Sequence, residues 1–223
     1  MIALLYQNRI EEALTLLEER GNKKEEHLQA AFMYRYIHPE SNNPFIPLLV
    51  DQVDEFEDKL MLDWEGTRLF DWNSKASLYY VSGDFEKAKE TLLHMDKAFV
   101  YKRIKPYNSF PENKYWEKAW HTAMLGCVYA KLGEYEKAKS QIDLLGQLEG
   151  LNQSTISMFY RGTHSYLIGR IYAEMGEKEL AVEYLQKSVK QGRPFAYMCY
   201  TADMYLLGLK GYPPFEELIR PKG

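Results

Sequence analysis

The chain has 223 residues and a net charge of −4, which results from 28 basic and 32 acidic side chains. This balance offers no strong positive field for binding nucleic-acid backbones. Two cysteines are too few for a disulfide-built scaffold or a cysteine-rich zinc module. The longest apolar runs are about six residues, far short of the roughly 20 of a membrane-spanning helix. We therefore expect no membrane segment, and a cytoplasmic location because no secretory signal opens the sequence.

The composition favours helices packed on helices. Tyrosine, phenylalanine and tryptophan number 18, 10 and 4, whereas proline numbers 9. Large rings fill the space between tilted helices. No segment alternates apolar and polar residues over six positions, as a half-buried strand would. The composition therefore predicts an all-α fold.

The first 62 residues predict divergent helices. Residues Asn8–Leu17 have the pattern of the second helix of a hairpin, whose first helix would begin before the sequence does. We expect either a longer natural chain or an incomplete first hairpin. Residues Lys24–Ile37 and Phe45–Leu62 predict a further helix pair, joined by a turn at His38–Pro44, which is rich in proline and asparagine.

An internal repeat follows. The segments Trp72–Met95, Thr122–Leu145 and Ser165–Ser188 align without gaps. Each has a small residue, a tyrosine, a glycine, an alanine and a large aliphatic residue at the same positions. A hairpin of two helices explains this spacing, because small residues let helices approach closely and glycine ends the first helix with a positive φ. The five positions are occupied by Ala76, Gly126 and Gly169; Tyr79, Tyr129 and Tyr172; Gly83, Gly133 and Gly176; Ala88, Ala138 and Ala181; and Leu92, Ile142 and Leu185.

An acidic residue comes directly after each of the three turn glycines. The residues are Asp84, Glu134 and Glu177. At the start of a second helix, a carboxylate accepts hydrogen bonds from free backbone N–H groups and meets the positive end of the helix dipole. We therefore expect these three side chains to cap the second helices.

The three units resemble tetratricopeptide repeats, whose unit of about 34 residues has tryptophan, Leu-Gly, tyrosine, glycine, alanine and proline at fixed places. Trp72 matches the tryptophan position, and Leu125-Gly126 and Ile168-Gly169 match the Leu-Gly pair, from which Lys75-Ala76 departs. The small residues of successive units, Ala76, Gly126 and Gly169, are 50 and 43 residues apart, which is more than the about 34 residues of the family's unit. We therefore expect a loop inserted at 101–115 and an insertion at 146–157, where the helices could instead be longer.

The resemblance implies one right-handed α-solenoid domain over 1–223, with about five hairpins. Its parts are divergent N-terminal helices at 1–62, recognisable repeats at 69–100, 119–150 and 162–193, and a last helix and cap at 194–223. Residues Pro194–Leu209 predict a first helix, and the tail predicts a short capping helix that begins at proline and ends at Pro221 and Gly223. The tail resembles those that close tetratricopeptide regions in bacterial signalling proteins.

The sequence has no recognisable catalytic motif: it lacks a glycine-rich phosphate loop, H-E-x-x-H, G-x-S-x-G and C-x-x-C. His121 and His164 share one register position and could share a metal, but packing inside the hairpins is the more common role for such histidines. Cys127 and Cys199 are expected to be small buried side chains. We therefore expect no enzyme activity, no catalytic or metal-binding residues and no cofactor.

Two further segments have alternative interpretations. The acidic run Asp54–Asp58 is more typical of a solvated helix face than of a cation site, because it lacks the turn glycine of a calcium loop. The segment Tyr101–Tyr107 mixes rings with Lys102, Arg103 and Lys105, as single-stranded nucleic-acid sites do. The overall charge favours a solvated loop instead, so nucleic acid is not the expected partner.

In the family that the chain resembles, the first helices of the hairpins line a concave groove that holds partner peptides. Carried over by register, this groove has an aromatic lining with few charges. It lacks the lysine of the family's carboxylate clamp, so Trp120 and Tyr166 become the expected anchors for an apolar peptide. The inward positions are Phe70, Asn73, Ser77 and Tyr80; Trp120, Ala123, Cys127 and Lys131; and Thr163, Tyr166, Arg170 and Glu174.

The sequence therefore predicts a non-catalytic scaffold that binds a protein or peptide segment. The alternative is a sensory or regulatory region of a larger bacterial signalling or transcription-regulating protein. The identity of the partner and the formation of a homo-oligomer stay open.

Overall fold

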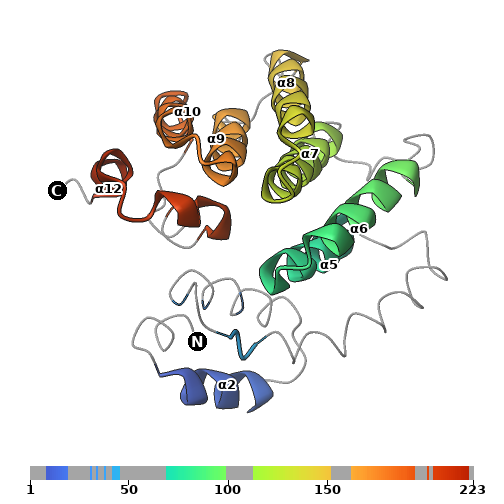
Figure 1. Cartoon of the computed structure of the whole chain (residues 1–223), viewed down its shortest axis with the longest axis vertical. Helices are drawn as coiled ribbons and strands as arrows, with labels where there is room; N and C mark the ends of the chain where they lie inside the picture. The colour runs from blue at the N-terminus through green and yellow to red at the C-terminus, as the bar shows by residue number, and fades with distance from the viewer. Residues whose placement is uncertain are drawn as a thin grey trace. The chain divides into compact units, whose positions relative to one another are not determined.

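The described residues of the computed structural model form helices, turns and loops, and no strand is found among them. The model describes residues 9–19, 31, 34, 38, 42–45, 69–98, 113–151, 162–193, 200 and 203–220. The prediction of an all-α helical-repeat fold is confirmed. None of the described helices is long and apolar enough to cross a membrane. The helices are α2 (Ile10–Glu19), α5 (Leu69–Ser82), α6 (Phe85–Ala98), α7 (Asn113–Lys131), α8 (Tyr135–Leu151), α9 (Thr163–Met175), α10 (Lys178–Lys190), the 3₁₀ helix η2 (Met204–Leu209) and α12 (Pro213–Ile219) (Figure 1).

The chain divides into two compact units. The first contains residues 1–91 and 202–204, and the second contains residues 92–201 and 205–223. Helix α6 begins in the first unit and ends in the second. Each unit is described by itself below.

The first unit contains α2 and the hairpin that α5 forms with the start of α6. Helix α2 buries Ala13, which occupies the position expected from the repeat pattern. Within the predicted turn at 38–44, the Asn43 side chain donates a 2.7 Å hydrogen bond to the Ala31 carbonyl and accepts one of 3.1 Å from the Phe45 N–H. The bond from Phe45, two residues after Asn43, is a local side-chain bond typical of turns. Most residues of the two helices predicted beside this turn lie outside the described part of the chain.

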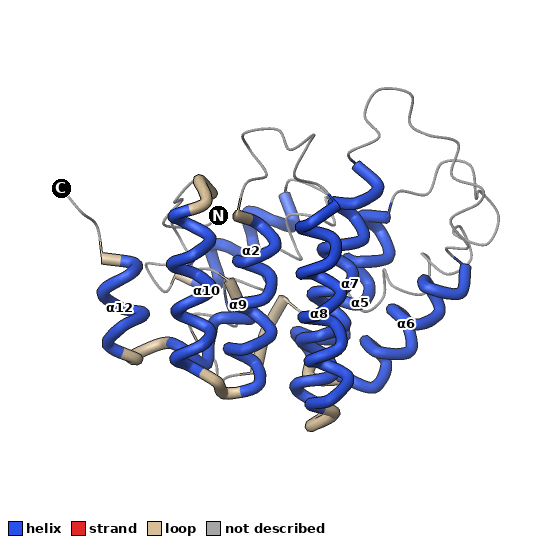
Figure 2. The backbone as a smooth tube through the Cα atoms, turned by 90° about the horizontal axis from the view of Figure 1, so that it is seen from above, coloured by secondary structure: helices blue, strands red, loops and turns tan. Residues whose placement is uncertain are grey.

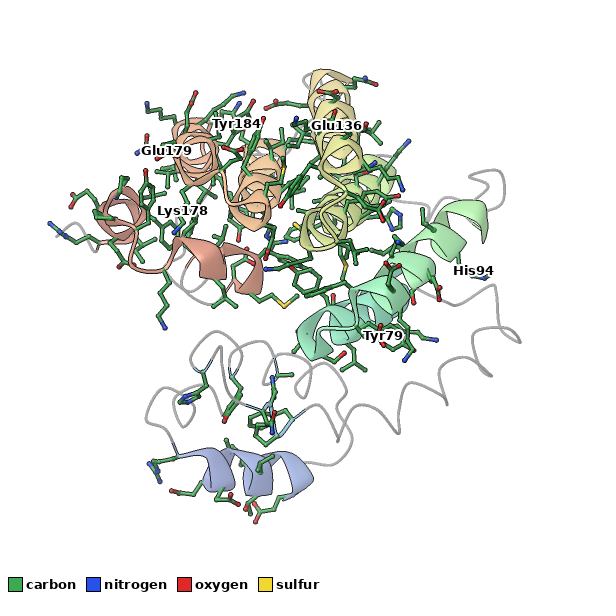
Figure 3. All side chains as sticks on the ribbon, in the orientation of Figure 1. Tyr79, His94, Glu136, Lys178, Glu179 and Tyr184 are labelled. Atoms are coloured by element: carbon green, nitrogen blue, oxygen red, sulfur yellow. The ribbon has the colours of Figure 1, made fainter. Side chains whose placement is uncertain are left out.

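The second unit contains two complete hairpins. Helix α7 packs against α8, and α9 packs against α10, while α7 and α9 lie side by side (Figure 2). The small-residue positions explain how closely these helices pack. A Cβ built on Gly126 would lie 2.5 Å from Cδ1 of Ile171, and one built on Gly169 would lie 3.1 Å from the Ala181 carbonyl oxygen. A side chain at Gly126 would displace the Ile171 side chain, and one at Gly169 would require the Ala181 backbone to shift by a few tenths of an ångström, so both glycines lie at close contacts between helices.

All three hairpin turns have the same geometry. Gly83, Gly133 and Gly176 have φ angles of 83°, 73° and 82°. The N–H of the residue after each glycine donates to the carbonyl of the repeat tyrosine, four residues before the glycine, at 2.9, 2.9 and 3.0 Å. This bond satisfies a carbonyl that the helix end leaves without a partner. The positive φ predicted for the three glycines is confirmed.

The three acidic residues after the glycines behave differently. Asp84 caps α6, because its Oδ1 accepts a 3.2 Å hydrogen bond from the Lys87 N–H. Glu177 precedes α10 but makes no side-chain cap, so the prediction was wrong for this residue. Glu134 pairs with the Lys137 ammonium group. Glutamate has one more methylene than aspartate and reaches past its own helix end toward neighbouring side chains.

The C-terminal part of the chain differs from the sequence prediction at residues 204–209. Residues 204–209 form the 3₁₀ helix η2 instead of the end of an α-helix. Gly208 and Gly211 are poor helix formers, and Pro213 follows closely, so only a short, tightly wound helix fits before the next one. The predicted short capping helix is present as α12, begins at Pro213 and packs against α10, with Phe215 and Ile219 buried.

Candidate partner-binding face

One side of α7 and one side of α9 carry eight of the predicted inward positions. On each helix the four residues are three or four positions apart, which places them on one helical face. Two contacts between α7 and α9 bring these two helical faces together. The Arg170 guanidinium carbon lies 4.7 Å from the ring centroid of Trp120, and the Lys131 ammonium nitrogen lies 2.5 Å from Oε2 of Glu174. The residues of this α7–α9 face are Trp120, Ala123, Cys127 and Lys131 on α7, and Thr163, Tyr166, Arg170 and Glu174 on α9.

Arg170 lies at the centre of an aromatic cluster. Its guanidinium carbon is 4.7 Å from the ring centroid of Trp120, 4.9 Å from that of Tyr166 and 4.7 Å from that of Tyr205. A cation within about 6 Å of a ring is attracted by the negative potential of the ring face. The three rings around the guanidinium group therefore fix its position. They also connect α7 and α9 to Tyr205 of η2.

Tyr166 lies beneath other side chains and is only 1% exposed. The Arg193 guanidinium carbon is 3.8 Å from its ring centroid, and the ring of Tyr200 meets it edge-on at 5.3 Å. Arg193 is itself held by a 2.7 Å hydrogen bond to the Thr163 hydroxyl. A partner could not touch the Tyr166 ring in this arrangement, so this tyrosine positions Arg170 instead of anchoring a peptide directly.

The accessible part of the α7–α9 face is small. Ala123, Cys127 and Thr163 are buried, whereas Trp120 and Arg170 are partly exposed. The Lys131 side chain is 38% exposed, while that of its partner Glu174 is 4% exposed. A partner that approaches this face therefore meets an indole ring and two basic side chains, a more basic surface than the predicted lining.

The remaining predicted positions belong to α5, in the first unit. Phe70 and Asn73 lie on this helix, but their side chains are outside the described part of the structure. Ser77 is half-buried. Tyr80 is buried, and its ring meets that of Phe85 edge-on at 5.2 Å. Its packing partner is thus the first residue of the next helix.

The residues considered for metal binding or catalysis are mostly buried. His121, His164 and Cys127 are buried inside the second unit, as predicted. Burial lowers the pKa of His164, while the Glu149 carboxylate acts in the opposite direction. Among the residues that the structure describes, no three histidine, cysteine or acidic side chains gather into a possible metal site. Cys199, the acidic run 54–58 and the basic segment 101–107 lie outside the described residues.

Three residues that pack on Arg170 or Tyr166 were not among the predicted face residues. Tyr205 occupies the register position of the repeat tyrosines, so the repeat pattern contained a signal for its packing against the preceding hairpin. Arg193 and Tyr200 follow the last complete hairpin, where the repeat spacing no longer fixes positions. Their contacts with Tyr166 depend on the course of the chain after α10.

Comparison with known proteins agrees with the geometry of the second unit. A family model described as tetratricopeptide repeat matches residues 123–143 and 165–191. These ranges contain the turns at Gly133 and Gly176 and most of the two complete hairpins. No curated protein and no solved structure matches the chain. The two hairpins formed by α7–α8 and α9–α10 are therefore tetratricopeptide repeats.

Proposed function

We propose that this chain is a non-catalytic scaffold that binds a segment of a partner protein on the α7–α9 face. Tetratricopeptide repeats generally mediate interactions between proteins, which supports a binding role. The proposal goes further by assigning that role to one face and one anchor residue, Trp120.

The position of Trp120 carries the proposal. Its ring is partly exposed on the face and is held from one side by Arg170, which the rings of Tyr166 and Tyr205 fix in turn. A side chain that is already ordered loses little conformational entropy on binding. Central tryptophan residues often contribute a large part of the binding energy at protein interfaces. We therefore expect Trp120 to insert against an apolar side chain of the partner.

The charge at the far end of the face from Trp120 adds a second requirement. Lys131 is exposed at one end of the face, and its partner Glu174 is buried. Exposed charges at the rim of an interface mostly change the association rate and its dependence on salt. We expect an acidic residue of the partner about 16 Å from its apolar anchor, because 11 residues of helix α7 separate Trp120 from Lys131, with moderate salt dependence of the affinity.

Co-purification of the full-length protein, with partners identified by mass spectrometry, tests this function. Trp120→Ala should lose a partner that the natural protein retains. Tyr135→Ala is the matched control, because Tyr135 is an aromatic residue that is 48% exposed on α8, outside the face. Equal recovery of every partner by both variants would contradict the assignment of the face.

A further inference from the structure

The ends of three helices meet at a polar junction in the second unit. The Ser165 hydroxyl, at the start of α9, donates a 2.7 Å hydrogen bond to Oε1 of Gln191, which follows α10. The side-chain amide of Gln191 donates a 2.9 Å hydrogen bond to Oε1 of Glu149, near the end of α8. Glu149 thus completes a chain of hydrogen bonds that links α8, α9 and the residue after α10.

A buried histidine lies next to this chain of hydrogen bonds. His164 is the second residue of α9 and is 4% exposed. Among the residues that the structure describes, none forms a hydrogen bond with its buried Nε2 atom. The first turn of a helix carries the positive end of the helix dipole, which disfavours a second positive charge. The position therefore suits a neutral imidazole and disfavours an imidazolium ion.

The charged groups around His164 have opposite effects on its protonation. The Glu149 carboxylate of α8 favours the protonated form of His164, but burial has the larger effect and lowers the pKa of His164 from its ordinary value of 6.5. Arg193, after α10, adds a positive charge near the start of α9 through its bond to Thr163. His121 is buried at the equivalent position of α7. Burial and the helix end therefore outweigh the single carboxylate.

We propose that His164 is an acid-sensitive element that loosens the junction of α8, α9 and α10 when its imidazole binds a proton. Protonation places a cation in a buried position at the start of α9. The Glu149 carboxylate is drawn toward this cation, and Gln191 then loses its acceptor. The link between the two tetratricopeptide hairpins weakens as a result.

The direction of the pH effect follows from proton linkage. Well above pH 6.5, His164 is neutral in both the folded and the unfolded chain. As the pH falls below 6.5, the unfolded chain binds a proton before the folded chain does, so acid favours unfolding. The loss of stability is complete once the pH is below the pKa of His164 in the folded protein.

Titration of the natural protein by NMR tests the premise directly. The ring protons of His164 should report a pKa below 6.5, and Glu149→Gln should lower it further, because this change removes the carboxylate that favours the proton. A pKa of 6.5 or above for His164 in the folded protein would overturn the proposal, even if no variant could be purified.

Thermal unfolding and amide hydrogen exchange test the consequence. From about pH 7.5 to about pH 5, the natural protein should lose about 2–4 °C more in Tm than His164→Gln, and the protection of amides in α9 and α10, corrected for the slower intrinsic exchange in acid, should fall. The matched control is His94→Gln, which removes an exposed histidine from α6 and should keep the natural pH dependence. Equal acid-induced losses in His164→Gln and the natural protein would contradict the inference.

Discussion

The guanidinium group of Arg170 packs on the indole ring of Trp120, with 4.7 Å between the guanidinium carbon and the ring centroid. The two residues come from neighbouring tetratricopeptide hairpins, so their contact depends on the register in which α7 and α9 pack. The same register brings Lys131 to Glu174 at the other end of the face. Any change that shifts α9 along α7 should therefore disturb the candidate site as well as the core.

The close approach of α7 and α9 at Gly126 gives the first prediction. Gly126→Leu should lower the free energy of unfolding by about 1–3 kcal/mol or more, because the new side chain must displace Ile171. Urea unfolding followed by circular dichroism measures this change. The matched control is Gly146→Ala in α8, where a new Cβ has no neighbour within 4 Å. The control should raise stability by about 0.5–1 kcal/mol, because alanine favours a helix interior. A loss of equal size at both positions would mean that the register of α7 on α9 is wrong.

Two glycines with similar backbone angles give the second prediction. Gly162 and Gly176 have φ angles of 74° and 82°. A Cβ on Gly162 would lie 2.2 Å from the Ser188 carbonyl oxygen, whereas one on Gly176 would meet nothing within 4 Å. Gly176→Ala should cost about 1–2 kcal/mol from backbone strain alone, and Gly162→Ala should cost clearly more. Thermal unfolding of both variants compares them, and equal Tm values would show that the start of α9 does not press against Ser188.

The cap of α6 gives the third prediction. Asp84→Ala should cost about 1 kcal/mol, because the Lys87 N–H loses its acceptor. Glu177→Ala is the control and should change stability by less than about 0.5 kcal/mol, since Glu177 makes no cap bond. Unfolding in urea at neutral pH measures both, and equal losses would contradict the difference between the two caps.

The same cap predicts a pH dependence. A hydrogen bond from the Lys87 side chain lowers the pKa of Asp84 below its ordinary value of 3.8; burial acts against it, and the bond from the Lys87 backbone N–H lowers it further. The contribution of Asp84 is therefore present above pH 3.8 and is lost as the pH falls through the lower pKa of the folded state. The difference in stability between the natural protein and Asp84→Ala should shrink over that acidic range. A difference that stays constant there would mean that the carboxylate charge plays no part in the cap.

The repeat pattern was sufficient to predict the hairpins. Gly83, Gly133 and Gly176 recur at one position, and only a residue that tolerates a positive φ fits the turn that each of them forms. Gly126 could likewise be assigned to a helix contact, because a small residue recurs at this position in all three units, which indicates that a neighbouring helix leaves little space there. These features are local, or they recur, so a single sequence contains them.

The accessibility of the face could not be predicted in the same way. Register placed Tyr166 on the inward side of α9, but its burial depends on Arg193 and Tyr200, which follow the last complete repeat. The proximity of Glu149 to His164 could not be predicted from the sequence either, because Glu149 lies in the insertion at 146–157, where the repeat spacing no longer fixes positions. Contacts made by such non-repeating segments depend on the path of the chain in space.

A binding titration of the identified partner at low and high salt tests the central claim most directly. The natural protein, Trp120→Ala and Tyr135→Ala should first show the same helical circular dichroism. The account predicts that Trp120→Ala weakens binding by about 2 kcal/mol or more, roughly 30-fold in Kd, at both salt concentrations, while Tyr135→Ala binds normally. Normal binding by Trp120→Ala, together with loss of all binding in high salt, would contradict the account and direct attention to Lys102, Arg103 and Lys105.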